Sequence, residues 1–174
     1  MTRVKRQGGK IRKSGARGAV PTAEQEPSWR HDNLGRLLIS VFSYVEQQLE
    51  RRVRERGFPE IRVVHLRLLR ELDIAGTRAI DLAQRLSVSK QAIAELVVEC
   101  ETLGLVVRRP DPSDGRAKLV GFSKRGHDLL KAGQDVIDDI QHKFEAEIGA
   151  KRMSVVIESM RRLRDYTRRE AEAA

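Results

Sequence analysis

Two short segments of the chain carry side chains of the types that bind double-stranded DNA. The first, residues 87–91, reads SVSKQ, and the second, residues 108–118, reads RRPDPSDGRAK. Hydroxyl groups at a helix N-terminus hold phosphate oxygens, lysine and glutamine donate to base edges, and arginine enters narrow minor grooves. These residue types predict a DNA-binding surface. Its candidate residues are Ser87, Ser89, Lys90, Gln91, Arg108, Arg109, Arg116 and Lys118.

The residues of the first segment have distinct expected roles on a helix that reads DNA. Lys90 and Gln91 are predicted on the outward face of its first two turns, where glutamine pairs with adenine and lysine donates to guanine or phosphate. Ser87 and Ser89 are expected to hold phosphates, although each could serve only to close a turn or cap the helix. Glu95 also faces outward, but phosphates repel its charge, so it is not a candidate contact.

The second segment is expected to form a charged hairpin. Arg116 at its tip is predicted to enter the minor groove, where narrow A·T-rich segments concentrate negative potential. Asp114 has the wrong charge to touch DNA and is expected to pair with Arg116 or another arginine, which would position the wing. Arg108, Arg109 and Lys118 would lie on the strands, some directed at phosphates and others at solvent. The alternative is an ordinary charged antiparallel ribbon.

Two helices joined by a turn must position the first segment. Apolar residues between Ile80 and Leu86 predict a short helix, followed by a tight turn at Ser87–Val88. Ser89 is a good N-cap for a second helix, which Gly104 ends by adopting the left-handed conformation. The residues expected to face the core are Ile80, Leu82, Ala83 and Leu86 of the first helix, and Ile93, Leu96, Val97, Cys100 and Leu103 of the second.

A β-hairpin is expected to follow these helices. Strand-like runs at 105–109 and 118–122 flank the turn-rich segment 110–115. Helix, turn, helix and hairpin in this order are typical of a winged helix-turn-helix, which binds DNA.

The segment Ile80–Leu130 resembles the MarR family of bacterial transcriptional regulators. It contains the Asp-x-Arg signature of the family's wing tip as Asp114-Gly115-Arg116, and the Ser-x-x-Gly that opens the next helix as Ser123-Lys124-Arg125-Gly126. Outside this segment only the helix pattern and lengths agree. The resemblance implies a homodimer that responds to a small molecule or a redox signal.

The fold class we predict is mainly α with a small β-hairpin wing. Residues 28–174 would form one domain, in which helices at 28–58 and 123–174 build a dimerisation lobe. Residues 59–122 would form the DNA-binding lobe, with a helix at 59–75 and the wing at 105–122. The long helices have more apolar surface than this lobe can cover, so they should pack against a second copy. Such a dimer would bind an inverted-repeat operator with half-sites about 10 base pairs apart.

The inward positions of the helix at 59–75 and of the helix after Ser123 follow from their apolar spacing. They are Ile61, Val64, Leu68, Leu69 and Leu72 in the former, and Leu129, Leu130, Val136, Ile137, Ile140 and Phe144 in the latter. Ile148–Gly149 should interrupt the latter helix before a last helix at about 151–169.

Charge is concentrated at the N-terminus. Of the formal net charge of +9, residues 1–18 contribute +7, which leaves only +2 for the remaining 156 residues. Residues 1–27 are therefore predicted to be a disordered basic tail, either an arm that follows phosphates or a merely solvated extension. The sequence contains no run of 18 apolar residues, so no membrane-spanning helix is expected. Its single cysteine fits a reducing cytoplasm. Binding to DNA would associate the protein with the bacterial nucleoid.

Two further residues have alternative interpretations. His65 could line an effector cleft or be a hydrogen-bonded core histidine, and Cys100 could be a redox switch or an inert buried thiol. The histidines show no metal-ligand spacing, and no motif of an enzyme is present, so we expect no metal, no cofactor and no catalysis. The sequence thus predicts a ligand-responsive repressor that binds a palindromic operator as a homodimer. The alternative is a winged-helix interaction or ligand-sequestering module without specific DNA readout.

Overall fold

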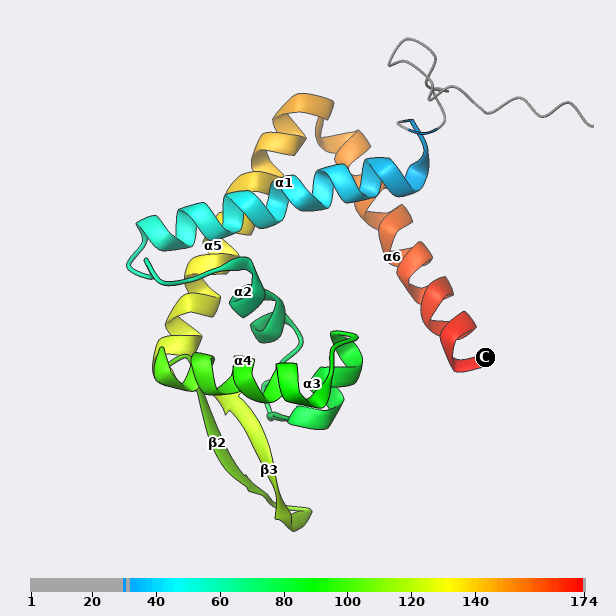
Figure 1. Cartoon of the computed structure of the whole chain (residues 1–174). Coiled ribbons are helices and arrows are strands. Elements are labelled where there is room, and N and C mark those ends of the chain that lie inside the picture. The colour runs from blue at the N-terminus through cyan, green and yellow to red at the C-terminus, as the bar shows by residue number, and fades with distance from the viewer. Residues whose placement is uncertain (1–29, 31, 174) are drawn as a thin grey trace, which may run out of the picture. The chain divides into compact units, whose positions relative to one another are not determined.

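The computed structural model describes residues 30 and 32–173, so the predicted basic tail at 1–27 lies outside the described residues. The chain divides into two units, Met1–Ile39 and Ser40–Ala174, and the contacts discussed below lie within the second. The elements follow one another in the order α1 (Leu34–Glu55), α2 (Val63–Arg70), β1 (Thr77–Arg78), α3 (Ala79–Arg85), α4 (Lys90–Thr102), β2 (Val106–Asp111), β3 (Asp114–Phe122), α5 (Lys124–Ile148) and α6 (Ala150–Ala173) (Figure 1).

The helix-turn-helix forms as predicted, with one exception. Ser89 caps α4, because its Oγ accepts a hydrogen bond from the backbone N–H of Ala92 at 3.1 Å. Ser87 takes a positive φ of 54° in the turn. Ile80 was expected in the core but is exposed, since residues two apart on a helix point about 200° apart and Leu82 faces inward. The other inward positions of α3 and α4 are buried or half-buried.

Helix α2 is shorter than the predicted helix at 59–75. It begins only at Val63 because the preceding loop buries Phe58 and Ile61, and it ends at Arg70. Val64, expected in the core, is 41% exposed. Leu68 and Leu69 are buried as predicted.

The hairpin is longer than predicted and belongs to a three-stranded antiparallel sheet of order β1-β3-β2. Pairing continues past Pro110, which lies opposite Lys118, so that only Pro112 and Ser113 form the tip. A bulge between Pro110 and Asp111 accommodates the change of register. Strand β1 was not predicted, because two residues are too few to show an alternating pattern; Thr77 pairs with Val120.

Helix α5 connects the sheet to the remaining helices. Ser123 caps it as predicted by accepting from the backbone N–H of Gly126 at 3.0 Å, and Gly149 ends it with a φ of 86°. The rings of Tyr44 on α1 and Phe144 on α5 lie 5.9 Å apart. Leu130 was expected to face inward but is 44% exposed, because α2, α1 and β3 do not close over this side of α5.

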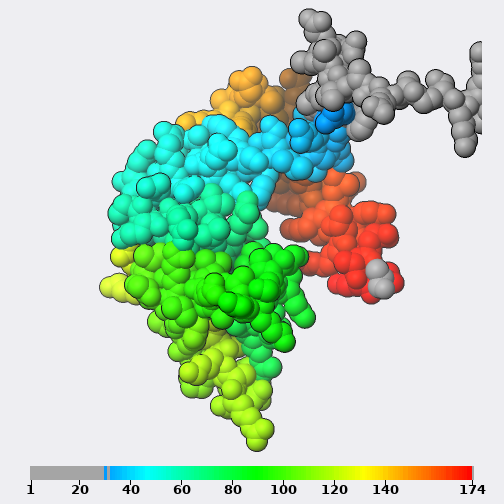
Figure 2. All heavy atoms as spheres, in the orientation of Figure 1, coloured from blue at the N-terminus to red at the C-terminus, as the bar shows by residue number. Residues whose placement is uncertain are grey.

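Helix α6 packs mainly against α5 and leaves much of its apolar surface uncovered. In Figure 2 its C-terminal half is separated from α3 by open space. Met153 is buried, whereas the exposed apolar residues of α6 are Val155, Val156, Met160, Leu163 and Tyr166. Within the described residues, no helix is long and apolar enough to cross a membrane.

The glycine of the Ser-x-x-Gly motif is required by a close backbone contact. A Cβ atom at Gly126 would lie 2.0 Å from the carbonyl oxygen of Leu105, a backbone atom of a fully buried residue. Gly126→Ala is therefore expected to lower the free energy of unfolding by about 1–3 kcal/mol or more. The matched control is Gly133→Ala in the same helix, where the nearest atom to a Cβ is the Leu49 side chain at 3.6 Å.

Chemical denaturation of the Gly126→Ala and Gly133→Ala variants measures the free energy of unfolding of each. The control should be neutral or stabilising, because alanine favours a helix over glycine by about 1 kcal/mol. Equal stability of the two variants would contradict the proposed role of the close contact at Gly126.

Candidate nucleic-acid interface

The N-terminal half of α4 presents the predicted readout residues to solvent. Lys90 and Gln91 are both exposed. The side-chain amide of Gln91 donates to Glu95 Oε1 at 3.0 Å, so Glu95 holds the glutamine on the outer face of the helix. Ser89 uses its oxygen as a cap, and Ser87 in the preceding turn is exposed. The positive end of the helix dipole at this N-terminus favours a phosphate.

The wing places two of the predicted basic residues where a ligand could reach them. Figure 2 shows the hairpin tip projecting from the helices into open space. Arg116 and Lys118 are exposed, and in the part of the chain that the structure describes neither side chain has an ion-pair or hydrogen-bond partner. The guanidinium of Arg116 therefore remains available.

The two arginines of β2 are held by the protein itself. Arg108 pairs with Glu101 on α4 at 3.3 Å. Arg109, on the opposite face of the strand, donates to the carbonyl oxygen of Ala75 at 2.5 Å, and its guanidinium lies against Gly121. Both side chains thus brace the hairpin, which distinguishes them from Arg116.

A residue that sequence reasoning missed holds the tip of the wing. Asp111 is only 6% exposed, and its Oδ1 accepts from the backbone N–H and the hydroxyl of Ser113 at 2.8 and 2.7 Å. Its Oδ2 accepts from Nε and Nη2 of Arg78 at 2.7 and 2.6 Å. Arg78 is the residue before α3, so this pair ties the wing to the start of the helix-turn-helix. An Asp-Pro-Ser turn was the available sequence signal.

Asp114 makes weaker contacts than Asp111. Its Oδ1 accepts from the backbone N–H of Arg116 at 3.1 Å, and its Oδ2 lies 3.7 Å from Arg78 Nη2. It therefore faces an arginine, as predicted, but that arginine is Arg78, and Arg116 contributes only its backbone. A wing-positioning role for Asp114 remains a prediction.

The wing should be sensitive to acid through Asp111. Hydrogen bonds from Ser113 and Arg78 lower the pKa of Asp111 to about 2. Because the folded state favours the carboxylate, its stabilising effect is complete above the unfolded pKa of about 3.9 and is lost as the pH falls from about 4 to about 2. We expect the Ser113 amide to exchange hydrogen faster in that range, relative to the Leu129 amide in the core.

The Asp111→Asn variant is the test of this assignment. It should show fast exchange at Ser113 already at neutral pH and little additional change between pH 4 and pH 2. Exchange can be followed by NMR of the wing amides. A slow, pH-sensitive Ser113 amide in Asp111→Asn would assign the pH dependence to another group.

His65 connects α2 to α4. The ring is fully buried, and its Nδ1 accepts from the backbone N–H of Arg62 at 3.1 Å. Nε2 therefore carries the proton and lies 3.2 Å from Glu99 Oε1, which also pairs with the Arg62 guanidinium. The hydrogen bond from Arg62, and next that from His65, lower the pKa of Glu99. The geometry favours the core interpretation of His65.

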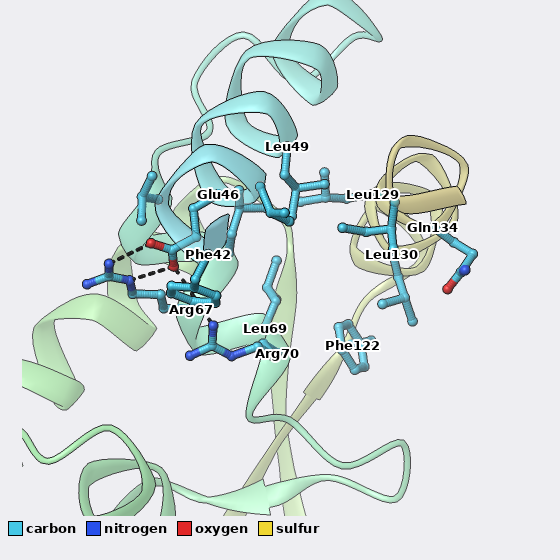
Figure 3. A pocket seen from close by; sticks show the side chains of 15 residues that line it. Phe42, Glu46, Leu49, Arg67, Leu69, Arg70, Phe122, Leu129, Leu130 and Gln134 are labelled. Carbon is cyan, nitrogen blue, oxygen red and sulfur yellow. Dashed lines mark hydrogen bonds and ion pairs between the residues drawn. The ribbon is translucent and has the colours of Figure 1, made fainter. Parts of the chain in front are cut away.

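A cavity of about 290 Å³ opens between α1, α2 and α5, close to the end of β3 (Figure 3). His65 is not among its lining residues. They are Phe42, Val45, Glu46, Leu49, Val63, Leu66, Arg67, Leu69, Arg70, Phe122, Leu129, Leu130, Gly133, Gln134 and Ile137. Sequence reasoning missed this set because its members come from segments far apart in the chain.

Cys100 fits the interpretation of a packing residue. It is fully buried, and burial raises the pKa of its thiol to about 12. The thiol therefore stays protonated at neutral pH, which makes it a poor nucleophile. Among the described residues, no group of three or more His, Cys, Asp or Glu side chains could hold a metal ion.

Comparison with known proteins identifies relatives of the central segment and of the fold. Residues 60–117 match the family model described as "MarR family". The transcriptional regulator HosA of Escherichia coli O111:H- is 24% identical over 91 residues, which cover 52% of this chain and 67% of HosA.

Solved structures extend the likeness beyond that segment. CouR from Rhodococcus jostii RHA1, solved bound to p-coumaroyl-CoA, is 27% identical with a TM-score of 0.60, covering 76% of this chain and 89% of CouR. Wild-type MarR from E. coli in the apo form is 20% identical with a TM-score of 0.62, covering 75% of this chain and 96% of MarR. At that identity the second comparison supports the fold.

Proposed function

We propose that this chain, which belongs to the MarR family of winged-helix transcriptional regulators, is a ligand-responsive repressor that binds an inverted-repeat operator as a homodimer. The observation that carries DNA binding is the difference between the arginines of the wing. Arg108 and Arg109 are held within the chain, whereas Arg116, which lies on β3 just after the Pro112-Ser113 tip and not at the tip itself as predicted, has an available guanidinium. Lys90 and Gln91 on the exposed start of α4 supply the second set of contacts.

In this proposal α4 and the wing contact different grooves of the DNA. The α4 N-terminus enters the major groove, where Lys90 and Gln91 meet base edges and Ser87 and Ser89 meet phosphates. Arg116 enters the neighbouring minor groove. Lys118, exposed on β3, contacts the backbone, and the braced Arg108 and Arg109 keep the hairpin rigid.

The uncovered apolar face of α6 supports the homodimer. A contiguous set of exposed apolar residues on a monomer is typical of a protein interface. In a two-fold dimer the recognition helices would lie about 34–36 Å apart and reach half-sites about 10 base pairs apart. The apolar cavity beside α2 supports the response to a ligand, because α2 contacts α4 through Arg62, His65 and Glu99. A ligand that moved α2 would thereby shift the recognition helix.

Selection of bound duplexes from a random pool tests the proposal with the full chain. We expect an enriched inverted repeat with the stated spacing, and affinity for it that falls steeply with salt but exceeds affinity for a random duplex. Equal affinity for both duplexes would contradict sequence-specific binding. Absence of binding to either would favour the interaction module.

The basic N-terminus has a separate test. Deleting residues 1–18 should lower the slope of log affinity against log salt while the sequence preference persists. Loss of the preference on deletion would contradict the assignment of readout to α4 and the wing.

A further inference from the structure

The cavity beside α2 has few polar groups and an unusual charge arrangement at its edge. Of its fifteen lining residues, only Glu46, Arg67, Arg70 and Gln134 have polar ends. Figure 3 shows Glu46 and both arginines gathered on one side, with Leu129, Leu130 and Gln134 on the other. Its volume of about 290 Å³ would hold a small molecule with one or two rings.

Glu46 forms a bidentate ion pair with Arg67, the arginine that a ligand in the cavity would contact. Arg67 donates from Nε to Glu46 Oε1 at 2.9 Å and from Nη2 to Oε2 at 2.7 Å. The Glu46 side chain is only 15% exposed. The hydrogen bond from Arg67 lowers the pKa of Glu46, so the carboxylate is ionised at neutral pH. Both carboxylate oxygens of Glu46 and the Nε and Nη2 groups of Arg67 are thereby engaged in hydrogen bonds.

Arg70 is also engaged with anions of the protein. Its Nη1 lies 3.8 Å from Glu46 Oε1, its Nε donates to Glu71 Oε1 at 3.1 Å, and its guanidinium lies 5.6 Å from the centre of the Phe42 ring. Gln134 donates to Asp138 at 2.8 Å. The two cations at the edge of the cavity thus already have carboxylate partners.

This arrangement discriminates between ligand charges. An anion would have to share Arg67 and Arg70 with Glu46, and the two like charges would repel each other in a half-buried site. A cation would face two arginines. An uncharged apolar molecule would disturb neither pair and would gain by burying its surface.

We propose that the cavity takes an uncharged, largely apolar ligand of one or two rings, and that Glu46 sets this preference by pairing with Arg67 and lying beside Arg70 at its edge. The inference rests on the proposed function in treating this cavity as the effector site. It goes beyond that function by assigning the charge class of the ligand and the residue that selects it.

Two dyes with the same ring system test the charge preference in the full-length protein at neutral pH. N-phenyl-1-naphthylamine is uncharged, and 8-anilino-1-naphthalenesulfonate adds a sulfonate; both fluoresce when they enter an apolar site. We expect the uncharged dye to have a dissociation constant at least about tenfold lower than the anionic dye. Leu130→Trp, which fills the cavity, should weaken binding of the uncharged dye.

Variants of one glutamate test its role. Glu46→Gln frees Arg67 and leaves Arg70 with Glu71 as its carboxylate partner, so the anionic dye should bind at least about tenfold more tightly than to the wild type. Glu50→Gln, one turn later on α1 and outside this cavity, removes the same charge and should leave both affinities unchanged. Should Glu46→Gln fail to fold, Arg67→Gln serves instead. This variant leaves Glu46 charged and should lower the affinity for the anionic dye below that of the wild type.

Three results would overturn the proposal: wild type that binds the anionic dye as tightly as the uncharged one, folded wild type that binds neither dye, or Glu46→Gln that leaves the preference unchanged. Because the titrations contain no DNA, they fail independently of the operator-binding test. Operator binding without dye binding would retain the regulator and remove the ligand assignment.

Discussion

The Arg116→Ala variant is expected to bind the selected operator at least about 5- to 150-fold more weakly than the wild type, because each minor-groove contact of this kind is worth about 1–3 kcal/mol. The Arg116 side chain has no hydrogen-bond or ion-pair partner within the described chain, so its removal leaves no group unpaired and should not unfold the wing. Both wings of a dimer carry the change, so the upper part of the range is expected. Fluorescence anisotropy with a labelled duplex at fixed salt measures the effect.

Lys131→Ala is the matched control, since it removes one positive charge from an exposed position on α5, outside the wing. It should change affinity by little, and sedimentation should show the same oligomeric state for both variants and the wild type. Unchanged operator affinity in a folded Arg116→Ala protein would show that the wing does not read DNA. That result would favour the interaction module.

The Met160→Glu variant is expected to be monomeric at micromolar concentration and to lose about a hundredfold or more in operator affinity. Met160 lies with Val156 and Leu163 on the exposed apolar face of α6. A carboxylate buried in a dimer interface without a partner costs several kcal/mol, and a monomer engages only one half-site and forfeits the gain from linking two. Light scattering coupled to size-exclusion chromatography and the anisotropy assay measure the two effects.

Ser154→Glu places the same charge on the opposite side of α6, where the chain is also exposed. Its oligomeric state and affinity should match those of the wild type. A dimeric Met160→Glu protein would exclude this face from the interface. Monomers that still bound the operator at full strength would contradict the two-half-site mechanism.

The helix-turn-helix was predictable because its signals are local. The spacing of Ile93, Val97 and Cys100 gives one helical face, and Ser89 and Gly104 mark the two ends of α4 by chemistry that operates within a few residues. The same applies to Ser123 and Gly149 at the ends of α5. At these four helix ends, the residue that begins or ends the helix is adjacent to that helix in the sequence.

Contacts between distant segments set the features that sequence reasoning missed. Asp111 and Arg78 are 33 residues apart, and Glu46 and Arg67 are 21 apart on different helices. No periodicity reports such pairs. For a similar reason α2 begins later than the predicted helix. Phe58 and Ile61 are buried in the preceding loop, and their apolar side chains extend the helical spacing of the apolar residues in α2.

Strand β3 has a mechanical consequence, since Phe122 at its C-terminal end lines the cavity while Arg116 lies near its N-terminal end. Arg116 is six positions before Phe122, which makes a lever arm of at most about 20 Å at about 3.3 Å per residue. A pivot of only about 5° at Phe122 would swing the far end by about 2 Å, enough to break a hydrogen bond. Amplification of a small shift at the base of the ribbon is thus built into its length.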